Sequence, residues 1–298
     1  MDKYWLKSYP QDVPTIDPTE YSSLKELTEK SCAKYADRDA YVMMDRAMSY
    51  GELERDSAAF AAWLQHKAHA LPGTRIALMM PNVLQFPVAL FGAIRAGLTV
   101  VNVNPLYTSH ELEHQVNDAG AEIIVVLENF AQVVEHALPK TGLKTVIVTS
   151  VGGMLGTLKG TIVDFVVRRI HRKVPAWSIA GALRFEKLVA EGRGLALRPV
   201  QVGPEDIAFL QYTGGTTGVS KGAVLTHRNM VANVLQGRAW FGSKMPERAT
   251  YVIALPLYHI FSLTANALMF MLLGARGILI TDPRDFKGFV ASLARYPP

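Results

Sequence analysis

An eleven-residue stretch between two apolar runs concentrates residue types that hold phosphate groups. The segment from Tyr212 to Gly222 reads YTGGTTGVSKG, with four glycines, three threonines, one serine and one lysine. Glycines let backbone amides approach a ligand, hydroxyl groups supply donors and a metal ligand, and the Lys221 ammonium adds positive charge. This composition suits a polyphosphate. A flexible surface hairpin has the same composition, so composition leaves both interpretations open.

Two common phosphate-binding patterns do not fit this loop. The Walker A pattern needs a lysine directly after a glycine and a helix directly after that, whereas Lys221 follows Ser220 and precedes Gly222. The G-x-G-x-x-G spacing of dinucleotide-binding folds is also absent. Because the following run AVLT, residues 223–226, is typical of a strand, the sequence predicts a strand, loop, strand arrangement.

The order of the residues is more specific than their composition. From Tyr212 to Gly222 the loop resembles the phosphate-binding signature of the adenylate-forming enzymes, the family of acyl-CoA synthetases, luciferases and peptide-synthetase adenylation domains. LPLYHIFSLT, Leu255 to Thr264, resembles the family's next motif. Upstream, MMPNVLQFPVALFGAIRAG and VVNVNPLYTSHELEHQ resemble the long- and medium-chain fatty acyl-CoA synthetase branch. The resemblance runs from about Tyr21 to the end.

The resemblance implies site residues. It implies that His259 approaches the carboxylate substrate and that the helix after it lines the acyl pocket; without the motif, a lone histidine in an apolar run is more often a core residue. It also implies that Thr216 contributes a ligand to magnesium. The phosphate-loop positions that it implies are Tyr212, Thr213, Gly214, Gly215, Thr216, Thr217, Gly218, Ser220, Lys221 and Gly222.

An activity follows from the same resemblance. Family members activate a carboxylate by letting it attack the α-phosphate of ATP, which gives an acyl adenylate and pyrophosphate; the thiol of coenzyme A then displaces AMP. The expected cofactors are ATP, Mg²⁺ and coenzyme A, and the expected substrate is a fatty acid. The loop would position the anions and neutralise the departing pyrophosphate.

Several family features are missing from the chain. We find no Tyr-Gly-x-Thr-Glu segment, no later aspartate for the ribose, and no C-terminal catalytic domain with its lysine. The chain therefore resembles the N-terminal half of a long-chain fatty acyl-CoA ligase, and we expect it to lack activity alone. The alternative is a half-length protein that binds nucleotide or fatty acid without turnover.

Apolar, β-branched runs that alternate with helical patterns must position these residues. The runs lie at 75–80, 98–103, 123–127 and 146–149. They predict an α/β fold of layered, mainly parallel sheets flanked by helices. We expect residues 1–200 to form an N-terminal α/β subdomain with a basic connector near 151–203. Residues 201–298 would begin an incomplete nucleotide-binding subdomain.

Local signals predict several helix ends. Residues 49–52 and 108–111 fit the capping box, in which the cap hydroxyl and a glutamate three residues later satisfy exposed amides reciprocally. A helix is expected from about His227, with Gly237 as a terminator. Asp282 and the proline after it are expected to begin the last helix.

The basic residues are concentrated near the middle of the chain. The formal net charge is only +5, but RRIHRK occupies Arg168–Lys173. Within Thr161–Lys173, apolar residues recur at near-helical spacing among basic ones, which predicts peripheral contact with anionic lipid at the inner face of the cytoplasmic membrane. A solvated helix explains these residues equally well. Nucleic-acid binding is not predicted, because the cluster is short and lacks interleaved aromatic residues.

Other sequence features bear on compartment and class. A single cysteine, Cys32, excludes an intramolecular disulfide, and the start MDKYWLKSYP lacks a secretory pattern, so we expect a cytoplasmic protein. The histidines and the cysteine have no metal-ligand spacing, so any metal is expected as the magnesium partner of a nucleotide. Ala249–Ala275 and Ile76–Ile94 contain no Lys, Arg, Asp or Glu, but prolines and polar residues interrupt both, which favours buried elements over membrane spans.

Overall fold

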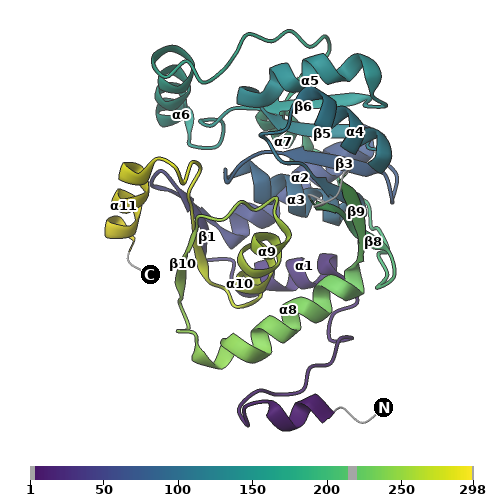
Figure 1. Ribbon diagram of the computed structural model, residues 1–298, viewed down its shortest axis with the longest axis vertical. Coiled ribbons are helices and arrows are strands. Elements are labelled where there is room, and N and C mark those ends of the chain that lie inside the picture. The colour runs from purple at the N-terminus through teal and green to yellow at the C-terminus, as the bar shows by residue number, and fades with distance from the viewer. Residues whose placement is uncertain (1–3, 214–219, 297–298) are drawn as a thin grey trace.

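Two sheets organise the described residues, 4–213 and 220–296 of this computed structural model (Figure 1). The larger sheet has the order β7-β6-β5-β3-β4-β8-β9 and the smaller β10-β11-β1-β2. The strands are β1 Asp39–Met43, β2 Arg46–Ser49, β3 Arg75–Met79, β4 Thr99–Asn102, β5 Ile123–Leu127, β6 Thr145–Thr149, β7 Leu183–Arg184, β8 Ile207–Thr213, β9 Lys221–Thr226, β10 Thr250–Ile253 and β11 Arg276–Leu279.

Most neighbouring strands are parallel. Only the β8–β9 and β1–β2 pairs among the described strands are antiparallel. The four apolar runs predicted as strands became β3, β4, β5 and β6. A strand that is buried on both faces of a parallel sheet reads as a continuous apolar run, as IIVVL of β5 does. The predicted α/β fold with mainly parallel sheets is confirmed.

Helices cover both faces of the larger sheet. On β3, Ile76 and Leu78 point into the main core with α2, α3 and α7, whereas Ala77 and Met79 belong to a second core with α4 and α5. The α-helices are α1 Leu24–Lys34, α2 Tyr50–His66, α3 Gln85–Arg95, α4 Ser109–Ala119, α5 Ala131–Ala137, α6 Thr157–Phe165, α7 Phe185–Gly192, α8 His227–Phe241, α9 Ile260–Ser262, α10 Phe270–Leu272 and α11 Phe286–Arg295. Short 3-10 helices are η1 Tyr4–Ser8, η2 Glu128–Phe130, η3 Leu138–Lys140 and η5 Gly242–Lys244, and π-helical segments are η4 Val166–Ile170 and η6 Leu263–Met269.

Both predicted capping boxes are confirmed at the starts of α2 and α4. The Ser49 and Thr108 side chains accept hydrogen bonds from the backbone N–H groups of Glu52 and Glu111, and each glutamate accepts from the backbone of its cap residue. These contacts lie within four residues of chain, so they form wherever the local sequence allows them.

The prediction that Gly237 ends its helix is wrong. Helix α8 begins at His227 as predicted but continues to Phe241. A Cβ added to Gly237 would lie 2.6 Å from Met269 Sδ of η6. The glycine therefore permits close packing between two helices and does not serve as a terminator.

The predicted start of the last helix is also wrong. Asp285, not Asp282, is the N-cap residue of α11, and its side chain accepts a hydrogen bond from Gly288 N–H. Asp285 N–H donates to the Asp282 carbonyl, so a turn forms first and the helix begins one turn later.

Strands from both sides of residue 200 share each sheet. β8 and β9 extend the sheet that contains β3 to β7, and β10 and β11 join β1 and β2. The segment 151–203, expected as a basic connector, contains α6, β7 and α7. A subdomain division at residue 200 stays a prediction.

Candidate functional site

The two arms of the glycine-rich loop are adjacent antiparallel strands. Thr213 at the end of β8 lies opposite Lys221 at the start of β9, and Tyr212 lies opposite Gly222. β8 runs parallel to β4, so the arms lie at the carboxyl edge of the sheet's parallel strands. Open α/β sheets bind ligands at this edge. The predicted strand, loop, strand order is confirmed for the arms.

The centre of the predicted loop is not part of the description. Gly214, Gly215, Thr216, Thr217 and Gly218 lie outside the described residues. At the base, the Ser220 hydroxyl donates a hydrogen bond to the Thr213 carbonyl at 2.8 Å, which ties the two arms together. Thr213 and Lys221 are exposed. The nucleotide-binding roles of all these residues stay predictions.

Tyr212 braces the hairpin against helix α4. A Cβ on Gly222 would lie 2.9 Å from the Tyr212 ring, so the glycine leaves room for the ring. The Tyr212 hydroxyl donates to Asp118 Oδ2. Burial, and then the hydrogen bond to Asp118, raise the pKa of Tyr212 well above its ordinary value, so the phenol remains a neutral donor. In the described structure Tyr212 therefore holds β8 and β9 against α4.

His259 lies at the start of the helical segment that follows β10. It is the N-cap residue of α9, and its Nδ1 accepts a hydrogen bond from Phe261 N–H at 3.3 Å. Because Nδ1 accepts, Nε2 is the nitrogen that carries the proton in the neutral ring. The ring is exposed. His259 thus offers an N–H donor at a fixed position.

The helix after His259 contributes to the main core. Its apolar residues Leu268, Met269, Met271 and Leu272 are all buried there. A core and an acyl pocket use the same residue types, so the role of these residues in substrate binding stays a prediction.

Asn82 fastens the loop before His259 to the carboxyl end of β3. Its Nδ2 donates to the carbonyls of Ile253 at 2.9 Å and Leu255 at 3.1 Å, and its Oδ1 accepts from Leu257 N–H at 2.8 Å. The Thr281 hydroxyl donates to the Asn82 carbonyl. The side chain is buried, and its bonds to Ile253 and Leu257 are shielded from water, whereas the bonds that involve Leu255 and Thr281 are partly buried.

Gln211 connects the two predicted parts of the site. Its Oε1 accepts from Asn102 Nδ2 at 3.0 Å, and its Nε2 donates to the Tyr258 carbonyl at 3.1 Å. Gln211 precedes Thr213 by two residues, and Tyr258 directly precedes His259. The structure therefore brings the strand that enters the glycine loop next to the His259 loop.

The sequence interpretation missed these amides. Asn82 follows β3, Asn102 ends β4 and Gln211 lies two residues before the end of β8, and each is buried. Buried polar side chains are hydrogen-bonded in most proteins, so an amide at the end of an apolar run is a usable signal for a tie between loops.

Replacing Gln211 with methionine is expected to lower the free energy of unfolding by about 2 kcal/mol, because Asn102 Nδ2 and the Tyr258 carbonyl lose their partner. In the double variant Asn102→Leu/Gln211→Met, the loss should be smaller than the sum of the two single losses, since the unpaired donor is removed as well. Urea denaturation of the four proteins measures this coupling. Strictly additive losses would contradict the tie.

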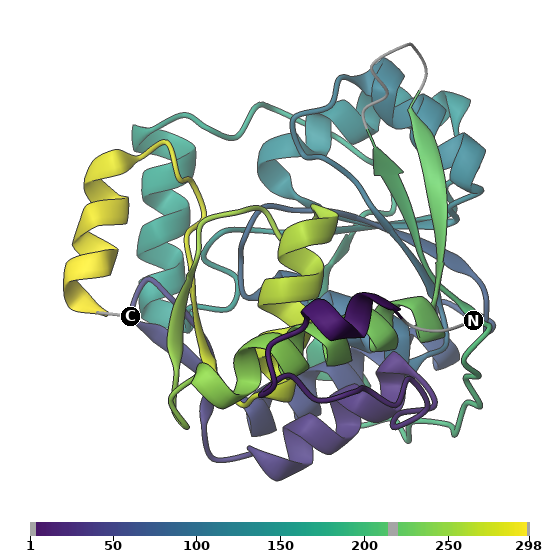
Figure 2. The same ribbon diagram turned by 60° about the horizontal axis from the view of Figure 1, so that its bottom comes forward.

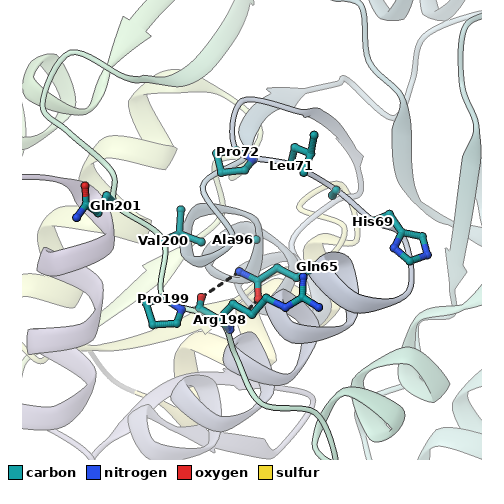
Figure 3. Close-up of a pocket in the computed structure, with 10 residues that line it drawn as sticks. Gln65, His69, Leu71, Pro72, Ala96, Arg198, Pro199, Val200 and Gln201 are labelled. Carbon is teal, nitrogen blue, oxygen red and sulfur yellow. Dashed lines mark hydrogen bonds between the residues drawn. The ribbon is translucent and has the colours of Figure 1, made fainter.

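A cavity lies at the opposite edge of the larger sheet. It has a volume of about 370 Å³, and Leu71, Pro72 and Ala96, which precede β3 and β4, are among its lining residues (Figure 3). Figure 3 also shows the Gln65 side chain hydrogen-bonded to the backbone of Arg198. Because this is the amino edge of the parallel strands, the cavity does not belong to the candidate site.

The described residues contain neither a metal cage nor a membrane span. Within residues 4–213 and 220–296, no three His, Cys, Asp or Glu side chains group closely enough to hold a metal ion. None of the helices in these ranges has the length and apolarity needed to cross a bilayer. The stretches Ala249–Ala275 and Ile76–Ile94 instead contain strands and shorter helices.

Comparisons with known proteins find one matching family and a set of curated ligases. A profile of the family described as AMP-binding enzyme matches residues 28–298. The long-chain-fatty-acid–CoA ligase of Escherichia coli O6:H1 is 52% identical over 299 residues, which cover 100% of this chain and 53% of that ligase. The chain spans about half the length of the curated relatives that it matches.

Solved structures share the fold. The crystal structure of an anthranilate CoA ligase in complex with anthranoyl-AMP matches with a TM-score of 0.78 and 18% identity, over 95% of this chain and 50% of that one. A long-chain-fatty-acid–CoA ligase from Archaeoglobus fulgidus matches with a TM-score of 0.71 and 23% identity, over 92% and 50%.

Proposed function

The chain belongs to the AMP-binding enzyme family, and from this premise we propose that it is the N-terminal part of an ATP-dependent long-chain fatty acid–CoA ligase. The observation that carries the proposal is the Gln211 tie, which joins the strand entering the phosphate loop to the residue before His259. Acyl activation requires a nucleotide phosphate and a carboxylate to meet, so the two binding elements must be adjacent. The 52% identity to a long-chain ligase supports a fatty acid as the substrate.

In this proposal the chain's own residues bind and orient two anions. Thr213 and Lys221 present a hydroxyl and an ammonium to the phosphates, and Lys221 offsets the charge that develops on departing pyrophosphate. His259 Nε2–H donates to the carboxylate of the fatty acid. Coenzyme A is the acceptor of the acyl group in the second half-reaction.

Magnesium fits the proposal only as a partner of the nucleotide. The described acidic residues form no cluster of three, whereas Mg²⁺ is commonly bound by few protein ligands together with substrate phosphates and water. Thr216, proposed to hold the ion through its hydroxyl, lies outside the described residues. The ion would neutralise phosphate charge.

The proposal assigns the complete activity to a longer protein. The chain matches relatives over about half their length, so we expect the 298-residue chain to bind ATP without forming acyl-CoA by itself. We further propose that the protein is cytoplasmic and contacts the inner face of the cytoplasmic membrane.

Replacing Lys221 with methionine is expected to weaken ATP binding by about tenfold, because one exposed ammonium is worth about 1.4 kcal/mol beside a phosphate. Isothermal titration of the 298-residue chain with ATP and Mg²⁺ measures the affinity. Lys187→Met is the matched control, since Lys187 is also exposed but lies on α7. Unchanged affinity in Lys221→Met, or no binding by the parent chain, would overturn the loop assignment.

A second measurement tests the ligase against a half-length binding protein. The intact mass of the endogenous protein, captured from its source cells with an antibody to this segment, should be about twice that of the 298-residue chain. That protein should also exchange pyrophosphate into ATP only when a long-chain fatty acid is present. A half-length mass without exchange would favour the binding protein instead.

A further inference from the structure

Helix α6 and the π-helical turn η4 after it direct two charged side chains toward the protein. Asp164 accepts hydrogen bonds from the Ser150 hydroxyl at 2.6 Å and from Gly152 N–H at 2.8 Å. Arg168 donates two hydrogen bonds to the buried Glu128, at 2.6 and 2.8 Å. Val163 and Val167 pack against the main core beside them, so the inner face of this segment carries both charged and apolar side chains.

Two glycines hold α6 close to the body of the protein. A Cβ on Gly160 would lie 2.4 Å from the Gly152 carbonyl oxygen, and one on Gly152 would lie 2.2 Å from the Gly160 carbonyl oxygen. Only glycine allows backbones to approach so closely. The rotation of α6 about its own axis is therefore fixed by a backbone contact as well as by Asp164 and Arg168.

The outward face of α6 is apolar and uncovered. Leu158, Ile162 and Phe165, which share one helical face, are 78%, 55% and 59% exposed, and Ile170 in η4 is also exposed. Phe286 and Val290 of α11 are also exposed, and Figure 2 shows α11 at the same end of the molecule as α6. An exposed apolar face of this kind is typical of an interaction site.

The charges around this face select the partner. From Thr157 to Lys173 the chain has five Lys or Arg and one acid, Asp164, which is already bonded inward. Arg169 and Arg172 are exposed, and neither has an ion-pair partner within the described part of the chain. Apolar side chains surrounded by free cations complement a bilayer with anionic headgroups.

We propose that α6 and η4 dock the protein on an anionic lipid bilayer. Leu158, Ile162 and Phe165 enter the boundary between headgroups and acyl chains, and Arg169 and Arg172 contact lipid phosphates. The inference deepens the proposed function and rests on it for one point, that a fatty acid dissolved in a bilayer would reach the enzyme at this surface.

Co-sedimentation of the 298-residue chain with vesicles tests the docking surface. With equal parts of phosphatidylglycerol and phosphatidylcholine we expect binding that weakens at high salt, and with phosphatidylcholine alone we expect much weaker binding. The variant Leu158→Gln/Ile162→Gln/Phe165→Gln should bind the anionic vesicles at least about tenfold less, because three apolar side chains no longer leave water. All three positions are exposed, so the fold should tolerate them; circular dichroism checks this.

A matched control separates this face from general surface apolarity. Leu71, Leu106 and Phe241 are 71%, 62% and 56% exposed on other elements, so Leu71→Gln/Leu106→Gln/Phe241→Gln removes similar exposed apolar area and should bind like the parent. Equal loss in both variants, or retained binding in the α6 variant, would overturn the proposal. Self-association measured without vesicles would also overturn it, if the parent self-associates and the α6 variant does not. In that case a second copy of the chain would cover this face.

The vesicles contain neither ATP nor fatty acid, so the outcome does not depend on the proposed ligase activity. Vesicle binding with no ATP binding would contradict the proposed function alone. ATP binding with no vesicle binding would contradict the docking surface alone.

Discussion

Replacing Asn82 with alanine is expected to lower the free energy of unfolding by about 2 to 3 kcal/mol, chiefly because the buried Leu257 N–H loses its hydrogen-bond partner. The carbonyls of Ile253 and Leu255 also lose a donor, but they keep the bonds from Ile280 N–H and the Ser262 hydroxyl. The bonds join the carboxyl end of β3 to the loop before His259. Water cannot replace the side chain, since Asn82 is buried.

Urea denaturation of the 298-residue chain measures this loss. Asn117→Ala is a suitable control, because Asn117 also bonds two backbone groups, of Lys140 and Gly142, but at an exposed site. Asn117→Ala should lower the free energy of unfolding by less than about 1 kcal/mol, since water can form hydrogen bonds with the freed backbone groups. Faster hydrogen exchange at Leu257 N–H in Asn82→Ala would locate the damage in the His259 loop. Similar costs for the two variants would show that Asn82 does not hold this loop.

Acid is expected to destabilise the protein through His227 at pH values well above those that protonate carboxylates. His227 is buried, and its Nδ1 accepts a hydrogen bond from Leu24 N–H at 3.1 Å. Burial lowers the pKa of His227 to about 4, and the nearby Asp206 only partly opposes this. In the unfolded chain the pKa is near the model-peptide value of about 6.5. At pH values between these two pKa values, His227 is therefore protonated in the unfolded state and neutral in the folded state.

The sign and the size of the effect follow from this difference. Neutral His227 makes its full contribution to the free energy of unfolding above about pH 6.5. This contribution is lost progressively as the pH falls toward 4, by up to about 3 kcal/mol. In His227→Asn, where an amide oxygen can accept from Leu24 N–H without titrating, the free energy of unfolding should fall less over that interval. Urea denaturation near pH 7 and near pH 4.5 for both proteins gives the comparison.

A second histidine variant serves as the reference for this experiment. His69 is exposed and has a left-handed backbone with φ of 51°, which asparagine adopts readily. His69→Asn makes the same replacement at an exposed site, so it controls for the change of residue type itself. If His227→Asn retains the full loss between pH 6.5 and 4, another group is responsible.

Much of the fold and part of the site could be predicted from local sequence. The apolar runs of β3 to β6 and the capping boxes of α2 and α4 involve residues close together in the chain, so the pattern alone specified them. The strands on either side of the glycine-rich loop were predicted for the same reason. Gly237 misled the prediction because its packing partner, Met269, is distant in the sequence.

The sequence by itself determined which elements form. It also showed that the loop resembles a phosphate-binding signature and that Thr161–Lys173 is basic. Only the tertiary structure decided how these parts meet. Asn82 lies 171 residues from Ile253 and 175 from Leu257, and no pattern in the chain pairs a side-chain amide with backbone groups so far away. The direction in which α6 points its apolar face was likewise decided by its contacts with Gly152, Ser150 and Glu128. Secondary structure follows from neighbours in the chain, whereas positions in a site follow from neighbours in space.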